Sequence, residues 1–308
     1  MTILFHTTFK NKDKWKIIIQ KKFKNKKIIS IQDEKDFHDV DIAIIWNLPK
    51  SILKKLKNLK IIFSLGAGVD HILKLDDYKN TPIIRIKDPL MGELMYYYVQ
   101  SQILNYQVGN NQYNLAQRNK KWRSEILPTF SSKLTVGIIG MGFLGFIVGK
   151  YLKKNNYNVI GYKKNKVKKS NIKIFTGDEL FKFLALSDVL INILPSTKAT
   201  EKYINKKIFS RMKRKVLFIN IGRGSTVNEK DLISFLKKNK QSFASLDVFQ
   251  NEPLSKNSQL WSLPNVSITP HVASITLLDS AIDLIYKNYL KFKKNKKIKS
   301  DVDLNKGY

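Results

Sequence analysis

The sequence of 308 residues contains no cysteine, which excludes disulfides, thiolate nucleophiles and cysteine metal sites. It also lacks an apolar run of about 18 residues, so we expect no transmembrane helix. The first residues, MTILFHTTFKNKDKW, lack the succession of basic, apolar and small residues that is typical of a signal peptide. We therefore expect a soluble, cytoplasmic protein, and we predict no metal site.

Acidic residues and arginine are both scarce. Only 24 Asp and Glu oppose 56 Lys and Arg, so the formal net charge is +32, yet arginine occurs at just six positions. Such a charge would suit a nucleic-acid partner, but proteins that read bases favour the bidentate guanidinium. The lysines are spread along the whole chain together with Asn and Ile, which share A/T-rich codons. Biased codon usage is therefore the simpler explanation, and a nucleic-acid-binding protein is kept as a disfavoured alternative.

Short apolar runs rich in β-branched residues alternate with amphipathic, lysine-rich segments, which indicates parallel sheets covered by helices. One long helix is expected from Met91 to about Ala116, a linker over 118–132, and a last helix from Ile275 to about Phe292. Thr200 and Asn228 have the residue types of helix N-caps. We predict strands at 2–6, 27–30, 41–46, 60–66, 82–86, 133–140, 157–162, 188–194, 215–221, 242–248 and 265–269.

A glycine-rich segment, VGIIGMGFLG, ends the strand predicted at 133–140 and opens a helix expected over 143–155. Gly140, Gly142 and Gly145 have the G-x-G-x-x-G spacing. The first glycine permits a tight turn, the second lets backbone N–H groups approach a pyrophosphate, and the third lets helix and strand pack closely. The N-terminal end of the helix attracts phosphates. The segment predicts dinucleotide binding rather than a purely structural strand end.

The strand expected at 157–162 ends without an acidic residue. An NAD site usually carries Asp or Glu about 20 residues beyond the glycines, where the carboxylate binds the adenosine ribose. Lys163, Lys164 and Lys166 stand there instead, where a 2′-phosphate would lie. In so lysine-rich a chain their clustering is partly chance. The segment favours NADPH as the cofactor and leaves NADH as a possible one.

Three residues able to carry chemistry each follow a predicted strand. Arg223 lies between two glycines in FINIGRGSTVNEKDL, and its guanidinium matches a carboxylate. Glu252 lies with Asp247 in SLDVFQNEPL, and His271 follows the proline of SITPHVAS. Because parallel strands end at the same edge of a sheet, these side chains can converge. A carboxylate beside a histidine favours an imidazolium that can protonate a developing alkoxide. The alternative is a surface cation and a histidine that merely occupies a turn.

In this order along the chain, the segments resemble the D-isomer-specific 2-hydroxyacid dehydrogenases. The resemblance rests on VGIIGMGFLG, LINILPSTKATEKYIN, FINIGRGSTVNEKDL, SLDVFQNEPL and SITPHVAS. FSLGAGVDHIL, PLMGELMYYYVQSQIL, SQLWSLPNV and the terminal DVDLNKGY are most similar to the glyoxylate/hydroxypyruvate reductase A group of that family. The resemblance covers essentially the whole chain, and no catalytic motif is missing.

The resemblance implies a role for each candidate residue. Arg223 would bind the carboxylate and carbonyl of the substrate, His271 would donate the proton, and Glu252 would support the histidine. Trp46 would line the substrate pocket, and Asp247 would hold the nicotinamide carboxamide. The group usually has arginines where this chain has Lys164 and Lys166. The cradle for the substrate carboxylate would be Gly66, Ala67, Gly68 and Val69. The cofactor would contact Gly140, Gly142, Phe143, Leu144, Gly145, Lys163, Lys164, Lys166, Leu194, Pro195, Thr200, Ile221 and Asp247.

The same resemblance implies an α/β fold of two Rossmann-like or flavodoxin-like parallel-sheet domains with a cleft between them. A discontinuous substrate domain, 1–98 and 275–308, would surround a dinucleotide-binding Rossmann domain at 99–274. The resemblance also implies a homodimer. The implied reaction is the NADPH-dependent reduction of a small 2-oxo acid: glyoxylate to glycolate, and hydroxypyruvate to D-glycerate. Alternatives are a dehydrogenase of another acid, such as D-lactate or a phosphorylated hydroxy acid, a non-catalytic NADPH-binding regulator, and the nucleic-acid-binding protein. No membrane partner is expected.

Overall fold

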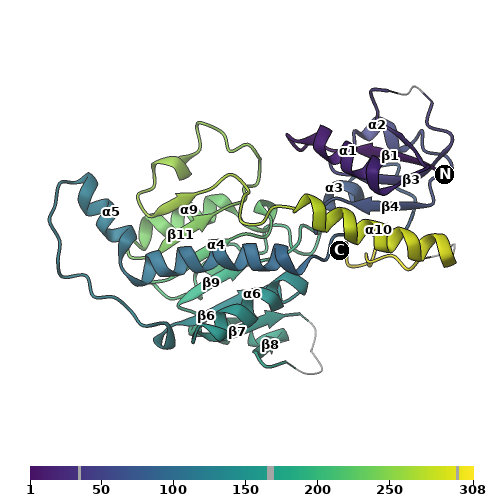
Figure 1. Cartoon of the computed structure of the whole chain (residues 1–308). Coiled ribbons are helices and arrows are strands. Elements are labelled where there is room, and N and C mark those ends of the chain that lie inside the picture. Colours follow the sequence, from purple (N-terminus) through teal and green to yellow (C-terminus); the bar gives the residue numbers. More distant parts are fainter. Residues whose placement is uncertain (34–35, 165–169, 296–297) are drawn as a thin grey trace. The chain divides into compact units, whose positions relative to one another are not determined.

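The computed structural model describes residues 1–33, 36–164, 170–295 and 298–308, so Lys166 lies outside the described residues. The chain forms two compact units (Figure 1). Unit 1 comprises Met1–Asp88 and Thr276–Tyr308, and unit 2 comprises Pro89–Ile275. The division after Asp88 precedes the expected boundary at residue 98, because the helix that begins at Pro89 packs its buried side chains into the core of unit 2.

Unit 1 is built on a five-stranded parallel sheet. Four consecutive residues of its third strand, 42–45, are each 0% exposed, as expected for a strand covered on both faces. The strand order β2-β1-β3-β4-β5 is the flavodoxin-like order of doubly wound sheets. The elements are β1 (Thr2–His6), α1 (Lys12–Lys22), β2 (Lys27–Ile29), β3 (Val40–Ile45), α2 (Lys50–Leu53), β4 (Ile61–Ser64), α3 (Asp70–Leu73), β5 (Ile83–Ile84) and α10 (Leu278–Asn295).

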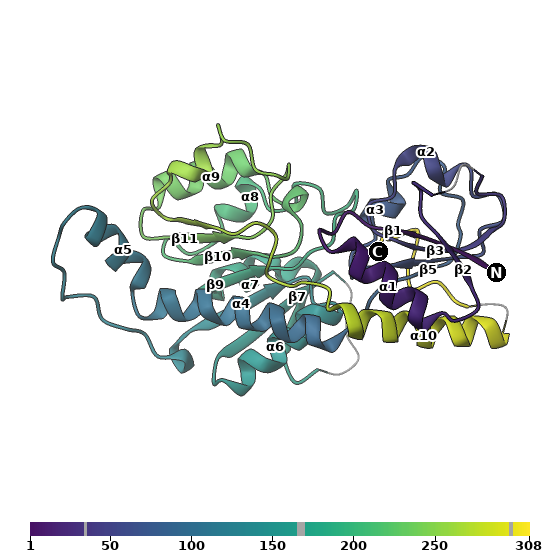
Figure 2. The same ribbon diagram turned by 45° about the horizontal axis from the view of Figure 1, so that its top comes forward.

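The end of the chain completes unit 1. Helix α10 lies beside α1 (Figure 2). Phe23, just after α1, packs its ring against those of Tyr286 and Tyr289, with centroids 5.1 and 5.0 Å apart. Beyond α10, the N–H of Asp301 donates to the carbonyl of Ile83 at 2.9 Å. These contacts explain why residues from both ends of the sequence form one unit.

Unit 2 is built on a seven-stranded parallel sheet of order β12-β11-β10-β9-β6-β7-β8. The first strand of the unit, β6, pairs with both β7 and β9, so the order reverses between β6 and β9, as in dinucleotide-binding sheets. Such a reversal leaves room for a ligand at the carboxyl ends of the two strands. The strands are β6 (Thr135–Ile139), β7 (Asn158–Lys163), β8 (Lys173–Thr176), β9 (Val189–Asn192), β10 (Leu217–Asn220), β11 (Phe243–Leu246) and β12 (Val266–Ile268).

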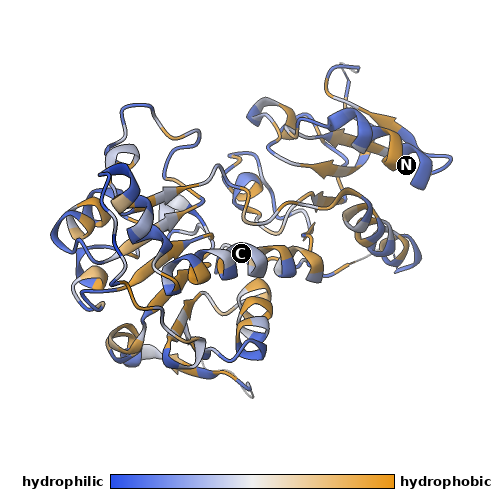
Figure 3. Cartoon of the chain, turned by 60° about the vertical axis from the view of Figure 1, so that its left-hand side comes forward, coloured by the Kyte–Doolittle hydropathy of each residue, from blue (hydrophilic) through white to orange (hydrophobic). Residues whose placement is uncertain are grey.

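Helices cover both faces of this sheet. In β9, Val189 and Ile191 pack with α4 and α6, whereas Leu190 packs with α7, α8 and α9. Because both faces are covered, the strands are mostly apolar between their ends, while the helices carry polar residues on their outer faces (Figure 3). The helices are α4 (Pro89–Gln107), α5 (Asn110–Arg118), α6 (Phe143–Lys154), α7 (Leu180–Leu186), α8 (Lys206–Phe209) and α9 (Glu229–Lys238). Short 3-10 turns are η1 (Ser131–Lys133), η2 (Gly177–Glu179), η3 (Gly224–Thr226) and η4 (Gln259–Ser262).

Several local predictions were wrong. The expected helix over 91–116 is two helices, because Gly109 has φ +75° and breaks the regular path. Thr200 caps no helix; the cap of α8 is Asn205, whose side chain accepts from the N–H of Lys207. Asn228 is the N-cap of α9, as predicted. The last helix begins at residue 278 rather than 275.

Among the described residues, no helix is both long enough and apolar enough to cross a membrane. The same part of the chain contains no cluster of three or more His, Asp or Glu side chains that could hold a metal ion.

Candidate active site

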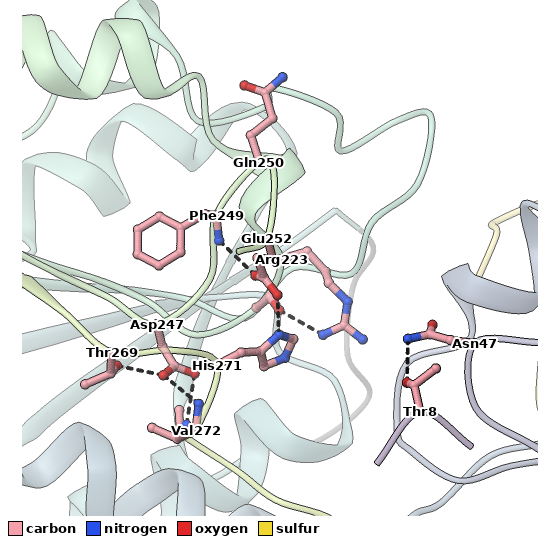
Figure 4. Close-up of polar contacts among 12 residues, drawn as sticks. Thr8, Asn47, Arg223, Asp247, Phe249, Gln250, Glu252, Thr269, His271 and Val272 are labelled. Carbon is pink, nitrogen blue, oxygen red and sulfur yellow. Dashed lines mark hydrogen bonds and ion pairs between the residues drawn. The ribbon is translucent and has the colours of Figure 1, made fainter. Parts of the chain in front are cut away.

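A histidine and a glutamate form a hydrogen bond at the carboxyl edge of the unit 2 sheet. His271 follows β12, and Glu252 follows the neighbouring strand β11. Nδ1 of His271 lies 2.8 Å from Oε2 of Glu252. In Figure 4 both side chains and that of Arg223 point toward one another. An ionised carboxylate only accepts, so the shared hydrogen belongs to Nδ1, and Nε2 is left for another partner.

The carboxyl group of Glu252 is held in its ionised form. Burial alone would raise its pKa, but hydrogen bonds from His271 and from the N–H of Phe249 (3.0 Å), with the charges of His271 and Arg223, hold the pKa below the ordinary 4.5. The carboxylate is therefore negative at neutral pH. It orients the imidazole and stabilises an imidazolium.

Two glycines determine the position of Arg223. A Cβ at Gly222 would lie 2.7 Å from the carbonyl oxygen of Leu194, and a Cβ at Gly224 would overlap the backbone of Phe249. Glycine at both positions lets the loops after β9, β10 and β11 approach one another closely. The guanidinium of Arg223 donates to the carbonyl of Gly222 at 3.0 Å. A partly buried cation thus lies near the histidine and glutamate, where it can bind an anionic group.

Asp247 holds the turn that carries the histidine. Its buried carboxylate accepts from the hydroxyl of Thr269 (2.7 Å) and from the N–H groups of Val272 (2.8 Å) and Ala273 (2.9 Å), as Figure 4 shows in part. Its carbonyl accepts from the N–H of His271 at 2.8 Å. His271 has φ +55°, a left-handed conformation that is uncommon for residues other than glycine and that the hydrogen bonds to Asp247 help to hold. A contact of Asp247 with the nicotinamide stays a prediction.

Tyr98 on α4 also supports this turn, although no sequence motif singled it out. Its hydroxyl lies 2.8 Å from Oγ1 of Thr269 and 3.0 Å from Oγ of Ser245. Thr269 gives its only hydroxyl hydrogen to Asp247, so it accepts from Tyr98, which in turn accepts from Ser245. Burial raises the pKa of Tyr98, so it stays protonated. The hydroxyl groups of Ser245, Tyr98 and Thr269 thus each donate to the next, and the last donates to the carboxylate of Asp247.

The glycine-rich loop lies where the strand order of unit 2 reverses. Gly140 has φ +101°, and a Cβ there would lie 2.7 Å from the carbonyl of Ile193 after β9. A Cβ at Gly145 would lie 2.5 Å from the oxygen of Gly140, so both glycines permit close packing. A Cβ at Gly142 would meet nothing within 4 Å. The backbone at the start of α6 is therefore open on one side, which fits the approach of a cofactor phosphate.

The other cofactor candidates follow neighbouring strands. Lys163 is the last residue of β7 and Lys164 is exposed, and no acidic residue occurs over 163–169. Thr200 is tied to this edge because its hydroxyl donates to the carbonyl of Pro195 at 2.6 Å. The remaining candidates lie at the start of α6 or just after β9 and β10: Phe143, Leu144, Leu194, Pro195 and Ile221.

The substrate candidates of unit 1 also follow strand ends. Trp46 comes directly after β3, and Gly66, Ala67, Gly68 and Val69 come after β4. A Cβ at Gly66 would lie 2.5 Å from the Trp46 ring, so that ring rests on the loop backbone. Their binding roles stay predictions.

Comparison with known proteins identifies the family. The sequence model for "D-isomer specific 2-hydroxyacid dehydrogenase, NAD binding domain" matches residues 101–273. Glyoxylate/hydroxypyruvate reductase A from Photorhabdus laumondii is 35% identical over 317 aligned residues, which cover 100% of this chain and 100% of that protein. The chain belongs to the D-isomer specific 2-hydroxyacid dehydrogenase family.

Two solved structures share its architecture. A D-isomer specific 2-hydroxyacid dehydrogenase from Xanthobacter autotrophicus Py2, in complex with NADPH and MES, is 29% identical with a TM-score of 0.92. An NADPH-dependent glyoxylate/hydroxypyruvate reductase from Sinorhizobium meliloti, in complex with NADP and sulfate, has the same two values. Each match covers 100% of this chain and 99% of the other. The family and the α/β fold with two parallel sheets, both predicted from the sequence, are confirmed.

Proposed function

We propose that this chain is an NADPH-dependent reductase that converts glyoxylate to glycolate and hydroxypyruvate to D-glycerate. The observation that carries the proposal is the hydrogen-bonded pair of His271 and Glu252, with Arg223 nearby, at the carboxyl edge of a dinucleotide-binding sheet. The activity named for the Photorhabdus and Sinorhizobium relatives supports the choice of substrates and cofactor. When bound, NADPH supplies the hydride that C2 of the 2-oxo acid accepts.

His271 would supply the proton. Its Nδ1–H is held by Glu252, so an imidazolium presents the hydrogen on Nε2 to the substrate oxygen. As C2 gains a hydride, its carbonyl oxygen gains negative charge and takes that proton. The product is a 2-hydroxy acid, and the neutral histidine regains a proton from solvent. The anion of Glu252 stabilises the charged histidine before the transfer.

Arg223 would bind the substrate's carboxylate and carbonyl oxygens through its planar donors. We also propose that the loop of Gly66, Ala67, Gly68 and Val69 offers backbone N–H groups to the carboxylate, and that Trp46 limits the size of the group on C2.

The residues of the glycine-rich loop fit the cofactor. The open space at Gly142 would receive the pyrophosphate, and Lys163 and Lys164 would attract a 2′-phosphate. The sequence over 163–169, which follows β7, contains no Asp or Glu that could select the free ribose hydroxyl of NADH. NADPH is therefore the expected cofactor, with NADH as a weaker one.

The test is NADPH oxidation with a panel of 2-oxo acids, including glyoxylate, hydroxypyruvate, pyruvate and a phosphorylated analogue. We expect His271→Asn, which tolerates the left-handed backbone, to lower kcat by about 100- to 10,000-fold, the usual contribution of a general acid. Turnover of none of these acids by the wild type, or an unaffected His271→Asn variant, contradicts the proposal. Faster reduction of pyruvate or of the phosphorylated acid would correct the substrate.

We further propose a homodimer, located in the cytoplasm. Three large apolar side chains after α5, Trp122, Leu127 and Phe130, are strongly exposed, Trp122 to 98%. This segment extends away from the rest of unit 2 in Figures 1 and 2. Apolar side chains so exposed indicate an interface with another chain. Light scattering should give twice the chain mass of 35.7 kDa, and Trp122→Ser with Leu127→Ser should weaken the dimer; a monomeric wild type contradicts this.

A further inference from the structure

His71, at the start of α3, contacts both substrate-binding segments proposed for unit 1. Its ring centroid lies 4.2 Å from that of Trp46, with an angle of 51° between the rings. The Trp46 ring in turn rests on Gly66, where even a methyl group would lie only 2.5 Å from it. Trp46, Gly66 and His71 are therefore packed as one group, although Trp46 follows β3 and the other two follow β4.

A chain of hydrogen bonds with determined directions passes through His71. The N–H of Asn47 can only donate, so Nδ1 of His71 accepts at 3.2 Å and the neutral ring carries its hydrogen on Nε2. Nε2 lies 3.2 Å from Oγ of Ser64 and donates to it. Ser64, whose side chain is buried, then gives its own hydrogen to the carbonyl of Gly68 at 3.2 Å. The imidazole thereby links the end of β3 to the loop after β4.

The residues just after β3, at one end of this chain of hydrogen bonds, are held by several contacts. The carbonyl of Asn47 lies 3.2 Å from Nε2 of His6, and its side chain donates to Thr8 at 3.3 Å (Figure 4). The N–H of Trp46 donates to the carbonyl of His6 at 2.9 Å. Asn47 has φ +53°, which asparagine tolerates better than most residues. The corner that carries Trp46 is thus anchored to β1, and His71 extends this anchorage to the loop.

We propose that His71 is a positioning residue, which fixes Trp46 and the backbone of residues 66–69 as one rigid surface for the 2-oxo acid. The inference rests on the proposed function, because it assumes that these segments bind the substrate. Backbone donors bind a carboxylate well only when their orientation is set before binding. The hydrogen bond from Ser64 sets the orientation of the loop, and the imidazole sets that of the Trp46 ring.

The kinetic test uses Ser64→Ala, His71→Asn and the double variant. Each interrupts the link between Asn47 and Gly68, and loss of one neutral hydrogen bond predicts a rise of about fivefold in KM for glyoxylate. The kcat should change by less than about twofold, and KM for NADPH should not change. The double variant should be no worse than the single ones, because all three interrupt the same link. The exposed His38, changed to Asn, is the control and should leave every constant unchanged.

A second measurement needs no substrate. The ¹⁵N NMR spectrum of the imidazole rings distinguishes hydrogen on Nε2 from hydrogen on Nδ1, and the signal of His71 is the one lost in His71→Asn. We expect the Nε2–H form of a neutral ring in the wild type. The Nδ1–H form, or a mixture, overturns the hydrogen-bond chain.

Unchanged KM for glyoxylate in both single variants, multiplied effects in the double variant, or an equal rise in KM for NADPH overturns the positioning role. Failure of the proposed function gives a different result, because the wild type would then turn over no 2-oxo acid while the tautomer of His71 could still be observed.

Discussion

Replacing Glu252 by Gln removes the negative charge next to His271 and keeps the size of the side chain. The amide oxygen can still accept from the N–H of Phe249, which holds Oε1 at 3.0 Å in the wild type. The amide nitrogen then faces Nδ1 of His271, where Oε2 lies at 2.8 Å. That nitrogen is a donor, so the imidazolium loses its acceptor while the loop keeps its shape.

The expected loss in kcat of Glu252→Gln depends on how far the side chains of His271 and Glu252 are exposed to water. Hydrogen bonds to charged groups contribute about 1.5–3 kcal/mol. The side chains of His271 and Glu252 are 40% and 36% exposed, so water screens part of the attraction and the lower part of that range applies. A loss of about 1.5–2 kcal/mol corresponds to a fall of about 10- to 30-fold in kcat, since 1.36 kcal/mol is about tenfold.

The assay is NADPH oxidation at saturating glyoxylate, with Glu229→Gln as the matched control. The carboxylate of Glu229 accepts from the N–H of Gln250 at 2.6 Å, in the same loop, rather than from the histidine. The control should keep nearly the wild-type kcat. A Glu252→Gln variant as fast as the wild type, or a control slowed equally, would refute the reasoning.

The lowered pKa of Glu252 also predicts how the stability of the protein changes with pH. The pKa of Glu252 is lower in the folded protein than its ordinary 4.5. Its contribution to stability is therefore complete above pH 4.5 and is lost as the pH falls through the lower folded value. Unfolding measured from pH 6 downward should show this loss in the wild type, and Glu252→Gln should lack it. If the wild type has already lost this contribution of Glu252 to stability at pH 4.5, the pKa of Glu252 is not lowered.

Four further variants test other parts of the site. Asp247→Asn should lower the free energy of unfolding by about 1–3 kcal/mol, because a buried N–H group loses its acceptor. It should also lower kcat, whereas an effect confined to KM for NADPH would favour a nicotinamide contact instead. Gly224→Ala should destabilise the fold by about 1–3 kcal/mol in thermal unfolding through overpacking, whereas Gly142→Ala should leave stability unchanged and raise KM for NADPH. Changing Lys163 and Lys164 together to Ser should raise KM for NADPH about 5- to 10-fold and leave KM for NADH nearly unchanged; an equal effect on both would exclude the 2′-phosphate contact.

The strands and the edge that carries the site could be predicted because both sheets are buried on two faces. Parallel strands of this kind are continuous apolar runs, and the polar residues that follow them must gather at one edge. Arg223, Glu252 and His271 were expected near one another for this reason, and Glu252 and His271 are hydrogen-bonded to each other.

Features that depend on tertiary contacts could not be predicted. The edge strand β8 is four residues long and follows a lysine-rich stretch, so its pattern was too weak to detect. Tyr98 carried no signal, because its role depends on the side of α4 that meets Thr269. Nothing in the sequence pattern singled out His71. Its partners, Asn47 and Ser64, meet only after the ends of β3 and β4 lie side by side.

Asp247 gives the turn after β12 an unusual protection from solvent exchange. Three consecutive amides, those of His271, Val272 and Ala273, all donate to this one residue, two of them to its buried carboxylate. They can become accessible to exchange only when the turn separates from Asp247. Their hydrogens should therefore exchange slowly and with one common protection factor relative to the unfolded chain. In the absence of any ligand, that factor would report the fraction of molecules in which the segment carrying the proton donor is open.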